Sequence, residues 1–139
     1  MKLIIGFCTL LCFISCEVDA PIMNHYNLEI PNGFPEINYP NDNLPNHERI
    51  ALGKRLFFDP ILSRDSSISC GSCHFQEFAF ADNKAVSPGV ESKLGTRNSM
   101  SLVNLAYADF FLREGGVPTL EMQVLAPIQD HNEMDFNII

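Results

Sequence analysis

The sequence Cys70-Gly71-Ser72-Cys73-His74 lies near the middle of the 139-residue chain and decides how the rest is interpreted. Two thiols three positions apart, followed at once by an imidazole, are what covalent attachment of a c-type haem requires. Each cysteine can form a thioether with one vinyl group, and His74 can then bind the iron as an axial ligand. The motif therefore predicts one covalently bound haem c, held by Cys70, Cys73 and His74.

Two other sites use closely spaced cysteines, a structural zinc site and a thiol–disulfide centre. Zinc needs four ligands, usually with a second close pair, but the other histidines are scattered at His25, His47 and His131. A redox Cys-x-x-Cys is expected between a strand and a helix, whereas residues 64–69 before the motif form a polar stretch typical of a loop. Haem is favoured over both.

The first residues are typical of a bacterial export signal. Met1-Lys2 precedes an apolar stretch over residues 3–14 that is too short to span a bilayer. It ends in Phe13-Ile14-Ser15-Cys16, which resembles the lipobox of lipoproteins. We expect residues 1–15 to be a signal peptide, Cys16 to be lipidated and the protein to lie in the periplasm, anchored to a membrane. The alternative is ordinary secretory cleavage near Ala20.

Cysteine usage and charge agree with this interpretation. Cys8 and Cys12 lie inside the predicted signal and Cys16 would carry lipid, so no thiol remains for a structural disulfide. The formal net charge is −8, and it becomes −9 when Lys2 is removed with the signal. Such an acidic chain repels nucleic acid, so we expect no nucleic-acid partner.

The remaining sequence predicts an all-α, loop-rich fold wrapped around one haem. Residues 16–46 are rich in proline and asparagine, which indicates an extended N-terminal tether. Helices are expected over 47–58, capped by Asn46, over 99–110, and from about 118 to 127. The folded domain, residues 47–139, is so short that a single core is marginal without a staple, and covalent haem could supply one.

Eight short segments, one of which contains the motif, form an ordered series along the chain. They are Leu52–Asp59, Ser69–His74, Ala79–Asp82, Gly95–Asn98, Leu102–Tyr107, Leu120–Gln123, Ala126–Ile128 and Glu133–Met134. This series resembles the N-terminal, cytochrome c-like haem domain of the bacterial di-haem cytochrome c peroxidases and the related MauG proteins. The resemblance covers residues 48–135.

The resemblance implies a cytochrome-c peroxidase, in which this domain reduces hydrogen peroxide to water. Electrons would come from a second haem in a C-terminal domain, supplied by a small donor cytochrome or copper protein, and members are often homodimers. Gln123 and Glu133 fall where the family keeps its catalytic distal residues, and Asn98 falls where it supplies a calcium ligand. Peroxide cleavage also needs a proton shuttle, and a glutamate with a raised pKa suits that role, although Glu133 could equally be a solvated acid.

The sequence departs from the family in three places. It has one Cys-x-x-Cys-His, so the second haem domain is expected to be absent. Arg113 stands where the family has tryptophan. The loop over 85–94 contains no histidine that could cap the iron. The last point predicts an open sixth position, for which Met100 is the alternative ligand. Two other functions stay open, a mono-haem electron carrier or inactive remnant, and a MauG-like oxidase acting on an organic or protein substrate.

Overall fold

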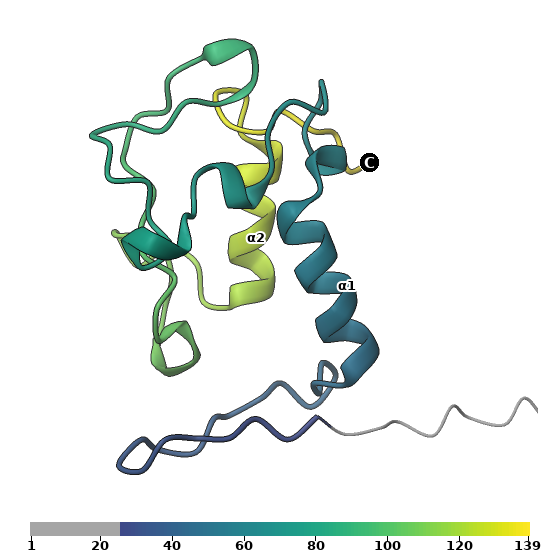
Figure 1. Cartoon of the computed structure of the whole chain (residues 1–139), viewed down its shortest axis with the longest axis vertical. Helices are drawn as coiled ribbons and strands as arrows, with labels where there is room; N and C mark the ends of the chain where they lie inside the picture. The colour runs from purple at the N-terminus through teal and green to yellow at the C-terminus, as the bar shows by residue number, and fades with distance from the viewer. Residues whose placement is uncertain (1–25) are drawn as a thin grey trace, which may run out of the picture.

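The protein was analysed as a computed structural model that describes residues 26–139 (Figure 1). Two α-helices, α1 (His47–Phe58) and α2 (Leu120–Gln129), are joined by a long connection. Short 3₁₀ turns interrupt this connection at Pro60–Leu62, Cys70–Ser72, Gln76–Phe78, Val90–Ser92 and Leu105–Tyr107. In this part of the chain only isolated β-bridges occur, so the predicted all-α, loop-rich class is confirmed. The predicted signal peptide, Cys16 and Ala20 lie outside the described residues.

Helix α1 has the bounds that its local signals predict. The Asn46 side chain accepts a hydrogen bond from the backbone N–H of Arg49 (2.7 Å), which satisfies a free donor at the helix start. At the other end the Asp59 N–H donates to the Arg55 carbonyl, and Pro60 follows. The helix lies against the haem motif, where the Phe58 ring approaches the backbone of Gly71.

Helix α2 also begins as predicted but runs further. Thr119 Oγ1 accepts from the Met122 N–H (3.2 Å) and caps the first turn. The helix was expected to end near residues 126–127, yet it continues to Gln129 with Pro127 inside it. Proline removes one intrahelical donor without ending this helix, which stops at Asp130, whose N–H donates to the Ala126 carbonyl.

The predicted helix over residues 99–110 is wrong. Only the 3₁₀ turn Leu105–Tyr107 forms there, and Asn104 before it has a left-handed backbone (φ 61°). The Ser99 hydroxyl instead donates to the Cys73 carbonyl and the Ser101 hydroxyl to the Ala79 carbonyl, each at 2.6 Å. Serine hydroxyls that bond to backbone elsewhere compete with helix formation, so the segment runs across the haem motif as an irregular chain.

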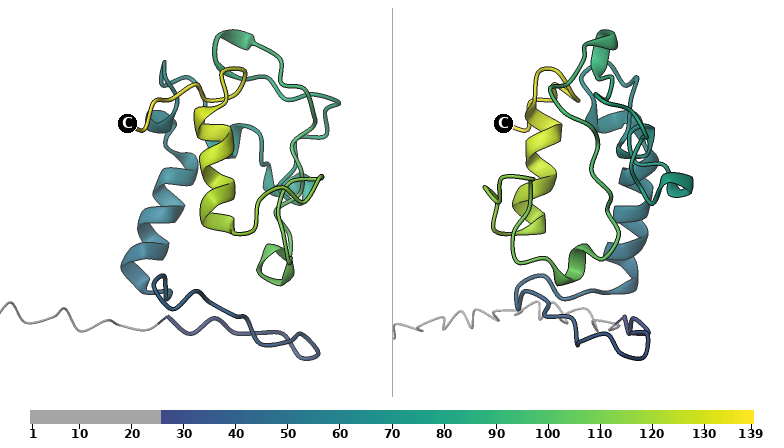
Figure 2. Two further views of the ribbon diagram at one scale, coloured as in Figure 1. Left: turned by 180° about the vertical axis from the view of Figure 1, so that it is seen from behind. Right: turned by 90° about the vertical axis from the view of Figure 1, so that its left-hand side faces the viewer.

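The N-terminal segment, residues 26–45, has no helix, as expected, but it is packed against the domain. It runs out and back beside the start of α1 and the turn Leu105–Tyr107 (Figures 1 and 2). The Phe34 ring contacts the Tyr107 ring, with centroids 5.5 Å apart. The Asn43 side chain donates to the Glu121 carboxylate at 2.8 Å, which ties the segment to α2.

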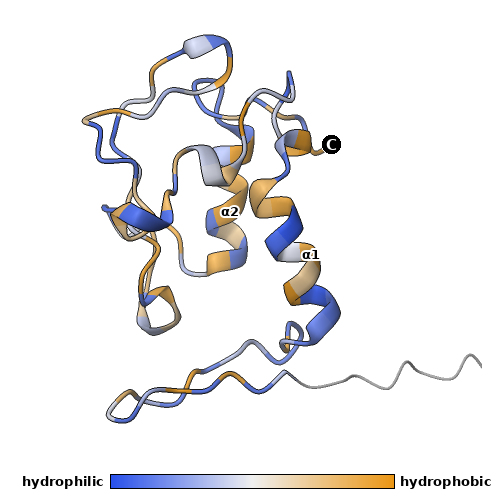
Figure 3. Cartoon of the chain, in the orientation of Figure 1, coloured by the Kyte–Doolittle hydropathy of each residue, from blue (hydrophilic) through white to orange (hydrophobic). Residues whose placement is uncertain are grey.

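The core formed by protein side chains alone is small. Four large apolar residues of the described chain are buried, Val90, Phe111, Ile128 and Met134. Apolar residues nevertheless lie along both helices (Figure 3), and many large ones, such as Phe58, Val124 and Leu125, stay exposed. A domain with so much exposed apolar surface needs a further apolar partner. None of the described helices is long and apolar enough to cross a membrane.

Candidate haem-binding site

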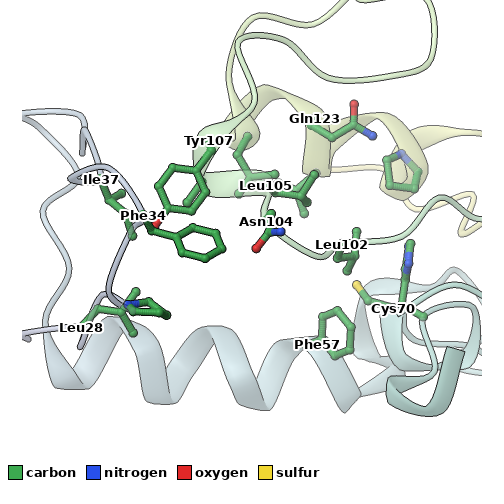
Figure 4. A pocket seen from close by; sticks show the side chains of 16 residues that line it. Leu28, Phe34, Ile37, Phe57, Cys70, Leu102, Asn104, Leu105, Tyr107 and Gln123 are labelled. Atoms are coloured by element: carbon green, nitrogen blue, oxygen red, sulfur yellow. The ribbon is translucent and has the colours of Figure 1, made fainter. Parts of the chain in front are cut away.

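A cavity of about 650 Å³ opens beside the Cys-x-x-Cys-His motif (Figure 4), within the size range of cofactor sites. Its walls come from the N-terminal segment, the end of α1, the motif, the connection over 102–107 and α2. The lining residues are Leu28, Pro31, Phe34, Ile37, Phe57, Cys70, His74, Leu102, Asn104, Leu105, Ala106, Tyr107, Leu120, Gln123, Val124 and Pro127. This lining is mainly apolar and places a few polar groups beside the motif, which is what a porphyrin needs.

Both motif cysteines are free thiols and half-buried. Burial raises the pKa of the Cys70 thiol. Burial also raises the pKa of Cys73, and the negative charges of Asp82 and Glu133 act in the same direction. Both shifts favour the neutral thiol over the thiolate.

The His74 ring is held in one tautomer. Its Nδ1 lies 2.6 Å from the Phe80 carbonyl oxygen, which can only accept, so Nδ1 carries the proton. Nδ1 also lies 3.0 Å from the Ser99 hydroxyl, whose own hydrogen is donated to the Cys73 carbonyl. Ser99 thus acts as a second acceptor for Nδ1–H. The other nitrogen, Nε2, keeps its lone pair for a metal.

We predict that Ser99→Ala weakens this hold on the imidazole. Removing one of two acceptors should lower the activity of the haem-loaded protein by about tenfold, as for other groups that orient a metal-bound histidine. The iron–histidine stretching frequency in resonance Raman spectra should shift. Ser99→Thr should restore both properties, and Ser101→Ala, whose hydroxyl bonds Ala79 instead, should change neither. An unshifted frequency in Ser99→Ala would show that the Phe80 carbonyl alone fixes the ring.

Gln123 faces the cavity from α2 (Figure 4). Its amide oxygen is buried and has no hydrogen-bond partner among the described residues. Buried polar groups are nearly always paired, so this oxygen is an exception among the described residues. Gln123, Cys70 and His74 line the same cavity, as their predicted roles require.

Glu133 lies close to the motif but is not one of the cavity-lining residues. Glu133 as a whole residue is exposed. Its carboxyl group is nevertheless partly surrounded by neighbouring atoms, and this burial raises its pKa. The negative charge of Asp130 acts in the same direction. The charge of Glu133 in turn acts on Cys73. The structure therefore gives Glu133 the raised pKa expected of a proton shuttle, and its catalytic role stays a prediction.

A close backbone contact fixes the turn that carries Glu133. The Val90 N–H donates to the Glu133 carbonyl at 2.8 Å, and a Cβ on Gly89 would lie 1.9 Å from the Asn132 carbonyl oxygen. Only glycine allows this approach. The charged side chain of Arg64 adds contacts to Glu91 (2.8 Å) and Asp135 (3.0 Å) across the same junction.

We predict that Gly89→Ala destabilises the protein by about 3 kcal/mol, because the added methyl group forces the two backbones apart. Urea unfolding monitored by circular dichroism measures this change. Gly53→Ala is the matched control, since a Cβ there meets nothing within 4 Å inside α1, and alanine should stabilise the helix by roughly 0.5–1 kcal/mol. Equal stabilities for the two variants would contradict the close contact at Gly89.

Asn98, the predicted calcium ligand, already forms a hydrogen bond with a positively charged side chain. Its side-chain oxygen accepts from the Arg113 guanidinium at 3.0 Å, and its amide donates to the Ser99 carbonyl. An ion pair between Arg97 and Glu114 joins the same two segments. The described residues contain no cluster of three or more acidic, histidine or cysteine side chains suited to a metal. These groups do not fit calcium as they stand.

Several residues near the site carry no signal in the sequence for a place there. Ser99, Leu28 and Ile37 reach it through contacts distant in sequence. Asp82 is 4% exposed, and one of its carboxylate oxygens has no hydrogen-bond partner among the described residues. Met100, the alternative sixth ligand, is absent from the lining, which contains no methionine and no histidine other than His74. The described walls of the cavity thus offer no second histidine or methionine ligand.

The motif, the cavity and the tautomer of His74 together define a c-type haem protein. The family described as di-haem cytochrome c peroxidase matches residues 47–138, about two thirds of the sequence. The chain therefore belongs to the di-haem cytochrome c peroxidase family, which includes enzymes named cytochrome-c peroxidase.

Individual relatives agree with this assignment. The chain is 40% identical over 90 residues to cytochrome-c peroxidase IdrP1 of Pseudomonas sp. strain SCT, covering 65% of this chain and 24% of that protein. It is 35% identical over 100 residues to the methylamine utilization protein MauG of Methylorubrum extorquens, covering 72% and 28%. The chain thus spans about a quarter of the length of these relatives.

Solved structures show the same fold. A MauG-like protein associated with microbial copper homeostasis is 34% identical, with a TM-score of 0.75, and the match covers 81% of this chain and 33% of that one. The di-haem peroxidase BthA of Burkholderia thailandensis is 32% identical, with a TM-score of 0.58, covering 68% and 28%.

Proposed function

We propose that this chain is a peroxidatic haem domain that reduces hydrogen peroxide to water with electrons from a small redox protein. The observation that carries the proposal is the cavity that the haem-attachment motif and the Gln123 side chain line together. A cavity that served only to shield an electron-transfer haem would not need a polar amide in its wall.

The chain's own residues divide the work of holding the cofactor. Cys70 and Cys73 would attach the haem through thioethers, and His74 Nε2 would bind the iron, since Nδ1–H is held by Phe80 and Ser99. When bound, the haem iron supplies the two-electron reduction that cleaves the O–O bond of peroxide. The apolar lining excludes water from this reaction.

Gln123 and Glu133 would supply orientation and protons. A glutamine amide can both donate to and accept from peroxide without a change in charge, which makes Gln123 an orienting group. We assign proton transfer to Glu133, because a raised pKa brings a carboxyl group closer to neutral pH, where it can both take and return a proton. The calcium ligand role of Asn98 would require Arg113 to release its side-chain oxygen.

The location and the electron supply are further parts of the proposal. The apolar stretch at the start of the chain and Cys16 support export to the periplasm with a lipid anchor. A small cytochrome or copper protein would deliver electrons. In the longer relatives, of which this chain spans a quarter, the remaining length has room for a second haem domain and a dimer interface.

Peroxide consumption tests the proposal directly. The full chain, matured with haem in a bacterial periplasm, should oxidise a reduced small cytochrome when hydrogen peroxide is added, and each peroxide should consume two reducing equivalents. A chain that carries haem and passes electrons but leaves peroxide intact would instead be an electron carrier. The 35% identity to MauG favours one second candidate, a haem oxidase of an organic or protein substrate, for which peroxide would be consumed only when that substrate is present.

A further inference from the structure

The N-terminal segment, residues 26–45, lies before the 47–138 region that matches the family, yet it forms one end of the haem cavity. Four of the lining residues come from it, Leu28, Pro31, Phe34 and Ile37. Figure 4 shows Leu28, Phe34 and Ile37 at the end of the cavity opposite Phe57 and Cys70. All four are apolar, so this end wall offers no hydrogen bond to water or to a hydrophilic solute.

A tight turn directs the central side chain of this wall. The Phe34 N–H donates to the Pro31 carbonyl at 3.1 Å, and Gly33 between them has φ +91°, a backbone conformation that glycine adopts readily. The turn brings the Phe34 ring to 5.5 Å from the Tyr107 ring on the other side of the cavity rim. The two rings thus close the wall between two segments that lie far apart in the sequence.

The second half of the segment forms hydrogen bonds with both helices. Asn43 donates to the Glu121 carboxylate on α2 at 2.8 Å, and this hydrogen bond lowers the pKa of Glu121. Arg49 on α1 donates to the Asn43 side-chain oxygen (3.2 Å) and to the Leu44 carbonyl (3.1 Å). Asn43 therefore links α1 and α2 through the N-terminal segment.

The same segment has a counterpart in a relative of known structure. The match to the MauG-like protein associated with copper homeostasis covers 81% of this chain, about 113 residues, whereas residues 47–139 number 93. That match must therefore reach about twenty residues upstream of residue 47.

We propose that the N-terminal segment is the apolar end wall of the haem cavity and that Phe34 keeps small hydrophilic reductants away from the haem edge. This role rests on the proposed haem in the cavity, but not on peroxide turnover. Water and charged solutes enter an apolar wall poorly, so electrons from a small charged reductant such as dithionite reach the ferric haem slowly. Selective access leaves electron entry to a donor that docks elsewhere on the protein.

Reduction of the haem-loaded full chain by dithionite, followed by stopped-flow absorbance, tests this role. Each SO₂ radical anion from dithionite gives one electron, and the iron goes from ferric to ferrous. Phe34→Ala should be reduced about fivefold faster than the unaltered protein, because the shortened side chain admits water to the haem edge. Phe78→Ala is the matched control. Phe78 is similarly exposed (42% against 46% for Phe34) but is not one of the cavity-lining residues. The reduction rate of this variant should equal that of the unaltered protein.

A second variant tests the position of the N-terminal segment without changing any side chain that lines the cavity. Asn43→Ala loosens the segment without altering a lining side chain, and the reduction rate should rise, though less than in Phe34→Ala. Rates equal to the unaltered protein in both Phe34→Ala and Asn43→Ala would overturn the proposal. A rate increase in a protein that does not turn over peroxide would keep the wall and reject only the peroxidase function.

Discussion

Glu133→Gln is expected to lower peroxide turnover of the haem-loaded chain by about 10²–10⁴-fold, the usual contribution of a positioned acid–base group. Glutamine keeps the size of the side chain but can neither take nor return a proton. Haem content should stay the same, because haem attachment is assigned to Cys70, Cys73 and His74 and not to Glu133. Steady-state oxidation of a reduced donor at saturating peroxide measures the change.

The pH profile gives a second measure of the same role. Burial and the charge of Asp130 raise the pKa of Glu133, so a carboxylate that first accepts a proton becomes active only above the ordinary carboxyl range. Turnover should rise with pH through this raised pKa in the unaltered protein, and the rise should be absent from the residual activity of Glu133→Gln.

Stability should change in the opposite sense. A carboxyl group with a raised pKa binds a proton more tightly when folded, so the free energy of unfolding falls as the pH rises from the ordinary carboxyl pKa through the raised one. Glu133→Gln should lose this dependence. Glu77→Gln, a change at an exposed glutamate near the motif, is the control for both experiments. Full turnover in Glu133→Gln would move the proton shuttle to another group.

The double variant Cys70→Ala/Cys73→Ala is expected to lose covalent haem completely, since both thioethers are removed. Each single variant keeps one thioether and should retain haem at a reduced level. Haem staining of the denatured polypeptide measures attachment, because haem that is not covalently bound separates from the chain. Ser101→Ala, which contacts neither cysteine in the structure, should stain fully.

Loss of haem should also destabilise the fold. Four large apolar residues form the buried core of the described chain, and the large cavity is lined mainly by apolar side chains that would pack on the porphyrin. We therefore expect the double variant to unfold at a much lower temperature than the haem-loaded protein. Equal unfolding temperatures would show that the domain does not depend on the cofactor for its core.

Local signals in the sequence predicted the two helices well. Asn46 and Asp59-Pro60 bound α1, and Thr119 begins α2, because caps and prolines act on neighbouring residues. The helix expected over 99–110 failed for the opposite reason. Its apolar spacing resembles a helix, but the hydroxyls of Ser99 and Ser101 bond to residues more than twenty positions away, and no local pattern reports such contacts.

The residues of the site were likewise predictable only where neighbouring residues in the sequence indicate them. Contiguous residues identified the haem motif, and the ordered series of segments located Gln123, which the structure places on the cavity wall. The acceptors of His74 Nδ1–H and the apolar wall from the N-terminal segment depend on how distant parts of the chain fold together. Prolines and asparagines in residues 26–45 predicted a tether, since composition describes the backbone and not what its side chains contact.

The ferric electron paramagnetic resonance spectrum of the haem-loaded full chain tests the central claim most directly. We expect His74 to be the only ligand of the iron from the described residues and the cavity side facing Gln123 to be open to peroxide, since the described lining contains no second histidine and no methionine. The expected spectrum is high-spin at neutral pH. A low-spin spectrum of the His/Met or bis-His type would contradict it and indicate an electron carrier.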